Sequence, residues 1–227
     1  MQCPNLSAKI AGHQRRKMFE RFVKSMNVEI LDTILDVGAT SDRGYYHSNY
    51  LEAWYPHKSQ ITAVGMDDAG FIESLYPGVK FMRADGKDLP FGCAAFDFVH
   101  SSAVLEHVGS RRQQIRFLRE AWRVARKGVF VTTPNRRFPV EFHTLLPLVH
   151  WLPSSLYRKL LVALRREFFA DENNLNLMSV ASLAHAARAA AIERFDIRSV
   201  SLLGWPTNLM LIALKPKGPG MAGVRGG

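Results

Sequence analysis

The chain has 227 residues, a length that suits one globular domain or one domain with an insertion, and its 47% hydrophobic and 22% charged residues match an ordinary folded protein. Its two cysteines, Cys3 and Cys93, lack metal-ligand spacing, which argues against a disulfide framework or a structural zinc site, so no metal is expected. The net charge of +10 favours anionic partners, without distinguishing a cofactor, an acidic substrate, lipid headgroups or nucleic acid.

Membrane and export signals are not evident in the sequence. No apolar run approaches the roughly 18–20 residues that span a bilayer. The N-terminal segment is polar and basic, and no apolar signal core precedes Gly38. We therefore expect a cytoplasmic protein.

The first predicted element is a basic amphipathic helix over His13–Val28, within an N-terminal segment 1–30 that packs on the core. Short apolar runs bounded by turn residues then predict five buried strands, at Thr33–Val37, Ile61–Met66, Val79–Ala84, Phe96–His100 and Val129–Thr133. Helix patterns separate them at Tyr46–Trp54, Ala69–Leu75 and Arg111–Arg126, the last stopping at Lys127-Gly128. Strands that alternate with helices predict right-handed crossovers and a parallel sheet.

The rhythm breaks over about 136–177, where three prolines precede a helix pattern from Ser155 to Phe169. A connection of this length predicts a cap inserted in a domain that spans 31–215. A helix capped by Ser179 follows, then strands at Phe195–Leu202 and Asn208–Leu214. Their short link favours an antiparallel hairpin at one sheet edge. The Gly/Pro-rich tail, 216–227, is expected to be disordered.

Small and acidic residues follow the first four predicted strands, where ligands bind in an open parallel sheet. A glycine after the first strand lets the backbone approach a ligand, and carboxylates after the next two can accept hydrogen bonds from ribose hydroxyls and from an adenine amino group. The residues concerned are Asp36, Gly38, Ala39 and Thr40 after the first strand, Asp67 and Asp68 after the second, Asp85 and Gly86 after the third, and Ser101 and Ser102 after the fourth.

The order and spacing of these motifs resemble the class I S-adenosylmethionine-dependent methyltransferases, in the type 11-like branch that contains small-molecule methyltransferases. The resemblance covers about Ile34 to Asn135 and rests on Ile34-Leu35-Asp36-Val37-Gly38, Asp67-Asp68, Arg83-Ala84-Asp85-Gly86, Phe96-Asp97-Phe98-Val99-His100-Ser101 and Val104-Leu105-Glu106-His107-Val108. It implies an α/β fold with a Rossmann-like, doubly wound seven-stranded sheet, mostly parallel with an antiparallel C-terminal hairpin strand.

The resemblance also implies S-adenosylmethionine as the cofactor. It places Asp36 and Gly38 near the methionine end, Asp67 or Asp68 on the ribose, and Asp85 with Gly86 on adenine. The sequence departs from the family where Ala39, Thr40 and Ser41 stand in place of further glycines. A pyridine dinucleotide is the rival cofactor, but it needs a three-glycine turn with room for a pyrophosphate.

Methyl transfer requires no enzyme nucleophile, and a base is needed only when the acceptor must lose a proton. Four titratable residues near the predicted acceptor side are candidates. We name His143 and His107 as catalytic candidates, with Glu106 and Glu141 beside them. Packing and capping roles are the alternative for each of these residues.

The expected acceptor is a small molecule, a sugar or a lipid-linked molecule. A nucleic-acid acceptor is disfavoured because the fourth strand lacks the Asn/Asp-Pro-Pro-aromatic signature of base methylation. A non-catalytic binding protein of the same fold is the third hypothesis. The cap helix combines an apolar face with flanking cations, so peripheral membrane contact is an alternative to packing on its own domain.

Overall fold

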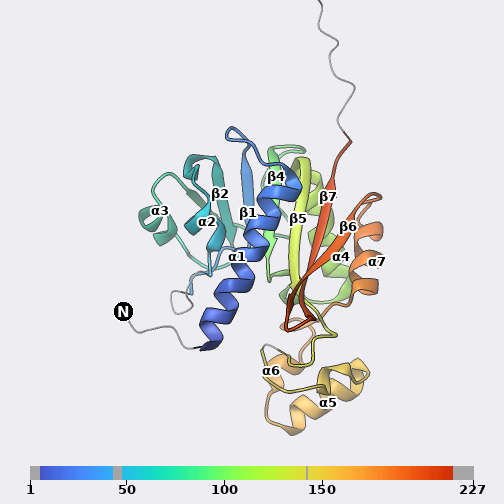
Figure 1. Cartoon of the computed structure of the whole chain (residues 1–227). Coiled ribbons are helices and arrows are strands. Elements are labelled where there is room, and N and C mark those ends of the chain that lie inside the picture. The colour runs from blue at the N-terminus through green and yellow to red at the C-terminus, as the bar shows by residue number, and fades with distance from the viewer. Residues whose placement is uncertain (1–5, 43–47, 142, 217–227) are drawn as a thin grey trace, which may run out of the picture.

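The structure is a computed structural model that describes residues 6–42, 48–141 and 143–216, and it is built on one seven-stranded sheet (Figure 1). The strands are β1 (Ile34–Val37), β2 (Ile61–Gly65), β3 (Lys80–Arg83), β4 (Phe96–Ser102), β5 (Ala125–Pro134), β6 (Asp196–Leu202) and β7 (Trp205–Leu214). Their order is β3-β2-β1-β4-β5-β7-β6. The first five strands are mutually parallel, whereas β7 runs antiparallel to both β5 and β6. The predicted fold class is therefore confirmed.

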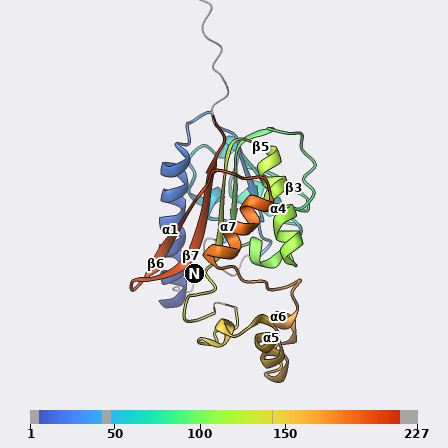
Figure 2. The ribbon, with the colours of Figure 1, turned by 90° about the vertical axis from the view of Figure 1, so that its right-hand side faces the viewer.

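Helices cover both faces of the sheet (Figure 2). They are α1 (Leu6–Met26), α2 (Tyr50–Trp54), α3 (Phe71–Leu75), α4 (Arg111–Val124), α5 (Ser154–Ala163), α6 (Glu167–Ala170) and α7 (Val180–Ala189), with short 3-10 helices η1 (Lys58–Gln60), η2 (Leu105–His107) and η3 (Val149–Trp151). One core cluster joins α1, α2 and α3 to one face, and a second joins α4 and α7 to the other. Strands buried on both faces read as continuous apolar runs, which is why β1, β2, β4 and β5 are visible in the sequence. The predicted burial of the third strand is wrong, because β3 lies at the sheet edge and is mostly exposed.

The N-terminal helix packs on the sheet through its apolar stripe. Met18, Phe19, Phe22 and Met26 are buried, and Phe22 is fully enclosed against Phe130 of β5, with the two ring centroids 5.4 Å apart. Burial of one such side chain stabilises the fold by roughly 1.5–3 kcal/mol. This helix thereby covers the junction between the parallel strands and the β6–β7 hairpin.

The predicted helix stop at Lys127-Gly128 is wrong, because α4 ends at Val124 and both residues lie inside β5. The side chains of Arg126 and Lys127 are held by carboxylates near the starts of β4 and β1. Lys127 pairs with Asp32, and the Arg126 Nη2 atom lies 2.6 Å from Asp97. These long-range ion pairs extend the strand through a sequence that locally reads as a helix end.

The C-terminal hairpin turns more tightly than predicted. Only Leu203 and Gly204 separate β6 from β7, with φ angles of +50° and +84°. A two-residue turn with both φ angles positive matches the twist of the strands it joins. Most of the predicted tail, from residue 217 onward, lies outside the described residues.

The cap lies beyond the carboxyl ends of the parallel strands, at the bottom of Figure 1. The predicted helix over Ser155–Phe169 is wrong as a single element, because it divides into α5 and α6 around Arg165, whose φ is +56°. Arg166 then donates a hydrogen bond to the Thr144 carbonyl, which ties the break to the first half of the cap.

Candidate active site

Two of the predicted cofactor carboxylates lie side by side at the carboxyl edge of the sheet. Gly65 and Arg83 pair as the last residues of β2 and β3, and Asp67 and Asp85 each come two residues after these strand ends. The Ala84 amide donates to the Gly65 carbonyl at 3.0 Å, so the two chains are still hydrogen-bonded at this level. The strand register therefore brings both carboxylates to one position along the edge.

The acidic pair after β2 divides its roles. The Asp68 Oδ1 atom accepts a 3.0 Å hydrogen bond from the Gly70 amide and so stabilises the start of α3. Asp67 is exposed, and within the described chain its carboxylate makes no hydrogen bond or ion pair. Asp85 accepts the Lys87 amide at 2.9 Å through Oδ1, while its Oδ2 lies 3.4 Å from the Lys87 Nζ. Of the two carboxylates after β2, Asp67 is thus the one with both oxygens open to hydrogen bonds from a ligand.

Internal hydrogen bonds satisfy the turn after β1. The amides of Gly38 and Ala39 both donate to the Val64 carbonyl, at 2.8 and 2.9 Å. The Thr40 amide donates to the Asn49 Oδ1 atom at 2.9 Å, and the Asn49 side chain returns a 3.0 Å bond to the Thr40 carbonyl. A pyrophosphate needs free amides at such a turn, so this arrangement disfavours a dinucleotide and fits a sulfonium cofactor.

Gly38 has a conformation and a neighbour that only glycine fits. Its φ is +109°, and a Cβ built on it would lie 2.0 Å from the Val104 Cγ2 atom. Gly86 is constrained by packing instead, because a Cβ there would lie 2.6 Å from the Phe117 ring. Both glycines hold the strand ends close to the helices and loops that follow them.

Asp36 belongs to a buried polar network rather than to an open pocket wall. Its Oδ1 lies 2.5 Å from the His100 Nδ1, and the His100 Nε2 lies 2.9 Å from the Tyr50 hydroxyl. Desolvation raises the pKa of Asp36 to about 7, although a hydrogen bond with Glu52 opposes the rise. Desolvation lowers the pKa of His100 to about 4. Asp36 is therefore a buried structural residue near the end of β1, linked to His100 of β4 and through it to Tyr50 of α2.

Glu52 of α2 completes this network, and we did not single it out from the sequence. Its side chain is fully buried, and burial together with the nearby Asp36 raises its pKa well above the usual value. Neither carboxylate oxygen receives a hydrogen bond from a donor group among the described residues. A proton shared between the Glu52 and Asp36 carboxyls accounts for both observations.

The two serines after the fourth strand do not both face a ligand. The Ser101 hydroxyl is fully buried and donates to the Val37 carbonyl at 2.7 Å, so it joins β4 to β1. This placement corrects the expectation that Ser101 faces the crevice. Ser102 is partly exposed, and its hydroxyl lies 3.0 Å from the Thr132 hydroxyl of β5.

The two catalytic candidates meet at the junction of the sheet edge and the cap. The Nε2 atoms of His107 and His143 lie 3.1 Å apart, although the residues are separated by 36 positions in the chain. The His107 Nδ1 lies 2.7 Å from the Asn174 carbonyl, and the His143 Nδ1 lies 2.7 Å from the Glu141 Oε1. Each ring is therefore oriented by an acceptor on its outer side.

Glu106 and Glu141 enclose this histidine pair with buried carboxylates. Burial opposes ionisation of Glu141, but hydrogen bonds from His143 and Thr144 outweigh it and lower the pKa of Glu141 to about 2. The Glu106 Oε2 accepts a 2.9 Å hydrogen bond from the Thr133 hydroxyl, and its Oε1 lies 3.8 Å from the His107 Nε2. Each of these four residues was predicted from the sequence as a candidate, but no sequence pattern indicated that they lie together.

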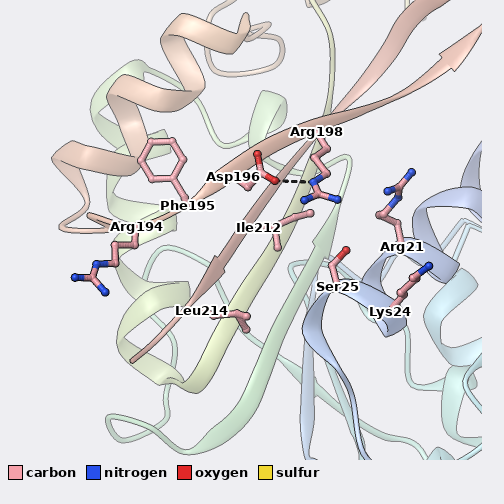
Figure 3. Close-up of a pocket in the computed structure, with 9 residues that line it drawn as sticks. All are labelled: Arg21, Lys24, Ser25, Arg194, Phe195, Asp196, Arg198, Ile212 and Leu214. Carbon is pink, nitrogen blue, oxygen red and sulfur yellow. Dashed lines mark hydrogen bonds and ion pairs between the residues drawn. The ribbon is translucent and has the colours of Figure 1, made fainter. Parts of the chain in front are cut away.

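A separate hollow of about 530 Å³ lies between α1 and the β6–β7 hairpin (Figure 3). Its lining carries the cations Arg21, Lys24, Arg194 and Arg198, and Arg198 forms a 2.6 Å hydrogen bond with Asp196. The residues that line it come from the end of α1, the start of β6 and the end of β7. None of the predicted cofactor residues lines this hollow.

The strand order and the residues at the strand ends define a class of protein. A sheet with five parallel strands and an inserted antiparallel seventh, with a carboxylate near the end of β1 and further carboxylates after β2 and β3, is the architecture that the sequence resemblance implied. It is that of the class I S-adenosylmethionine-dependent methyltransferases.

Comparisons with known proteins agree with this class. Residues 35–132 match the type 11 methyltransferase family model, described as a methyltransferase domain. A methyltransferase structure from Aquifex aeolicus aligns with a TM-score of 0.55 and 15% identity, covering 86% of this chain and 88% of that one. One from Mesorhizobium loti aligns with a TM-score of 0.58 and 14% identity, covering 87% and 98%. The structure of PigF with SAH aligns with a TM-score of 0.57 and 16% identity, covering 92% of this chain and 57% of that one. No curated protein matches in sequence.

Residues 35–132 thus carry a type 11 methyltransferase domain, and the chain has the fold of S-adenosylmethionine-dependent methyltransferases, enzymes whose cofactor is S-adenosylmethionine. In the part of the chain that the structure describes, no helix is both long and apolar enough to cross a membrane.

Proposed function

We propose that the enzyme methylates a small-molecule or lipid-linked acceptor held between the carboxyl edge of the sheet and the cap. The observation that carries this proposal is the convergence of His107, which follows β4, and His143, which begins the cap, with their Nε2 atoms 3.1 Å apart. The carboxylates predicted to bind the cofactor and the His107–His143 pair lie at the same edge of the sheet, so the methyl group of the cofactor and its acceptor can meet there.

The cofactor lies over the ends of β1, β2 and β3 in this proposal. Asp67 accepts hydrogen bonds from the ribose hydroxyls, because its exposed carboxylate makes no hydrogen bond or ion pair with the described residues. Asp85 and Gly86 lie at the adenine, one strand further toward the sheet edge. When bound, the cofactor supplies an activated methyl group, and the chain's own residues supply alignment and exclusion of water.

We expect Asp67→Ala to weaken S-adenosylmethionine binding by about 1–3 kcal/mol, the usual cost of leaving buried hydrogen-bonding groups unpaired. Asp68→Ala is the matched control, because its carboxylate is engaged by the Gly70 amide and caps α3. Isothermal titration calorimetry with both variants measures the difference. Equal affinities in the two variants would remove Asp67 from the ribose site.

The cap exposes an apolar surface that its own fold does not use. Of the predicted apolar face of the cap helix, Tyr157 and Leu161 are buried, whereas Leu156, Leu164 and Phe168 are 46–65% exposed. Further apolar side chains of the cap are exposed to a similar degree: Leu145, Leu148, Trp151, Leu152 and Val162. A surface of this kind marks an interaction site on a folded protein.

Exposed cations accompany this apolar surface. Lys159 and Arg165 are exposed, while Arg158 lies 3.4 Å from Glu172 and Arg166 donates to a backbone carbonyl. Apolar side chains flanked by cations match the surface of an anionic bilayer, where the former enter the acyl boundary and the latter meet headgroups. We therefore propose that the cap rests on an anionic membrane surface, where a lipid-linked acceptor is available.

Binding to anionic vesicles tests this membrane contact. Neutralising Lys159 and Arg165 to Gln should weaken binding to phosphatidylserine vesicles, measured by cosedimentation, by about 30-fold, at roughly 1 kcal/mol for each of the two cations near the surface. The matched control is Lys80→Gln with Arg194→Gln, which removes the same charge away from the cap. If the control loses as much binding, net charge alone accounts for it and the cap has no special role.

A nucleic-acid acceptor is the alternative, favoured by the net charge of +10. Contacts to several phosphates would make binding fall by orders of magnitude between low and moderate salt. Retention of RNA or DNA with that salt dependence, combined with failure to bind vesicles, would replace the lipid-linked acceptor in this proposal.

A further inference from the structure

Three potential metal ligands converge where the cap meets the sheet edge. One ligand atom from each of Glu106, His107 and His143 lies within 4.8 Å of the other two. The two histidine Nε2 atoms are 3.1 Å apart, and the Glu106 Oε1 is 3.8 Å from the His107 Nε2. Two nitrogens bound to one Zn²⁺ at about 2.0–2.1 Å in tetrahedral geometry lie roughly 3.3–3.4 Å apart, so little movement is needed.

The Nδ1 atoms of both histidines face acceptors, and the two Nε2 atoms face each other. The His107 Nδ1 faces the Asn174 carbonyl and the His143 Nδ1 faces the Glu141 carboxylate, both at 2.7 Å. Each acceptor requires a proton on the Nδ1 that it faces, which leaves the Nε2 of a neutral ring as an acceptor. At 3.1 Å the two Nε2 atoms form a hydrogen bond when one of the rings carries a second proton, and a metal ion can take the place of that proton. Carbonyl and carboxylate partners on the outer nitrogens are typical of metal-bound histidines.

Glu106 supplies an independent sign of a missing ligand. Its side chain is fully buried, and its Oε2 is satisfied by the Thr133 hydroxyl. Its Oε1 has no hydrogen-bond partner among the described residues, although a buried carboxylate oxygen is costly to leave unpaired. That oxygen lies on the side of the carboxylate that approaches the histidine pair.

We propose that Glu106, His107 and His143 bind a divalent first-row transition metal ion, represented by Zn²⁺. Two imidazoles and one carboxylate suit such an ion better than Mg²⁺, which prefers oxygen ligands. Three protein ligands leave at least one position open, as in catalytic rather than structural zinc sites. His107 is 39% and His143 23% exposed, so the ion is accessible from outside.

The role of the ion rests on the proposed function, whereas its binding does not. An acceptor oxygen that occupies the open position would lose its proton more readily, which favours its attack on the methyl carbon. The bond from that oxygen to the methyl carbon forms as the carbon–sulfur bond of the cofactor breaks, and the released proton goes to solvent. The two histidines then act as ligands and not as bases.

Metal titration of the chelator-treated, full-length protein tests the site without any acceptor. We expect one Zn²⁺ per chain by calorimetry, and visible absorption when Co²⁺ takes its place. His107→Ala and His143→Ala should each weaken Zn²⁺ binding by at least about 100-fold, and Glu141→Gln by about 10–100-fold, because a neutral amide oxygen accepts the outer hydrogen bond less strongly than a carboxylate. His185→Ala, at an exposed position on α7, is the matched control and should leave the affinity unchanged.

Glu106→Gln separates ligation from folding, because the amide oxygen can still accept the Thr133 hydrogen bond. It should weaken Zn²⁺ binding while thermal stability of the metal-free protein stays near that of the unmodified chain. Binding that survives both histidine substitutions, or that Mg²⁺ matches, would overturn the metal site. Bound Zn²⁺ with no methylation of any lipid-linked or small-molecule acceptor would leave the site intact and contradict the proposed function instead.

Discussion

Gly38→Ala is expected to destabilise the protein by about 2–6 kcal/mol, one of the largest effects of a single added methyl group in this chain. A non-glycine residue at a φ of +109° costs roughly 1–3 kcal/mol in backbone strain. The added methyl would also lie 2.0 Å from the Val104 Cγ2, and overpacking of this kind costs roughly a further 1–3 kcal/mol. Chemical denaturation of the two proteins measures the sum.

Two other glycines separate these contributions. Gly204 has a φ of +84° with nothing within 4 Å of an added Cβ, so Gly204→Ala should show the strain alone. Gly92 has an equally open surround and no positive φ, so Gly92→Ala should be nearly neutral. Val104→Ala in the Gly38→Ala background should recover part of the loss. A Gly38→Ala protein as stable as the Gly92→Ala protein would contradict the geometry of the β1 turn.

Glu52→Gln is expected to stabilise the protein above neutral pH, by an amount that grows with pH. Burial and the adjacent Asp36 raise the pKa of Glu52 well above its usual value, so the folded state keeps a proton that the unfolded state releases. Stability therefore falls as the pH rises above about 4.5, by up to about 1.4 kcal/mol per pH unit, until the folded-state pKa is passed. A glutamine side chain donates a hydrogen bond to Asp36 without holding a titratable proton.

The pH window for this measurement follows from His100. Desolvation lowers the pKa of His100 to about 4, so its burial costs stability as the pH falls below 6.5. That slope opposes the one from Glu52, and only above pH 7 is His100 neutral in both states. Urea denaturation from pH 7 upward should therefore show an unfolding free energy that falls for the unmodified chain until the folded-state pKa of Glu52 is passed, and a flatter dependence for Glu52→Gln.

Glu193→Gln provides the matched control, since Glu193 is exposed and should alter neither the stability nor its slope with pH. A Glu52→Gln protein with the same pH slope as the unmodified chain would mean that the Glu52 carboxyl is ionised when folded. The shared proton between Glu52 and Asp36 would then be wrong.

The inner parallel strands were predictable because burial on both faces makes them continuous apolar runs, whereas the edge strand β3 is mostly exposed. Ile34–Val37 is buried at every position, and the runs for β2 and β4 are nearly so. The end of α4 was not predictable in the same way. Lys127-Gly128 has the local chemistry of a helix stop, but Asp32, which is 95 positions away, holds Lys127 within β5. Local pattern carries no information about such a partner.

The candidate site shows the same division. Carboxylates after successive strands could be named, because chain position alone places them at one edge of a parallel sheet. Contacts that depend on the register between strands could not be predicted from the sequence. Asp36 lies directly opposite His100 in the β1–β4 pairing, and Glu52 approaches them from α2. Asn49 precedes a helix and has an ordinary capping chemistry, yet its side chain binds the Thr40 backbone. Folding of the cap, and not sequence spacing, brings His143 to His107.

The most direct test of the account is an experimental structure of the protein with S-adenosylhomocysteine. We expect the ribose hydroxyls on Asp67, the adenine beside Asp85 and Gly86, and the sulfur directed toward His107 and His143. Cofactor density away from the ends of β1, β2 and β3, for example in the hollow between α1 and the β6–β7 hairpin, would contradict it.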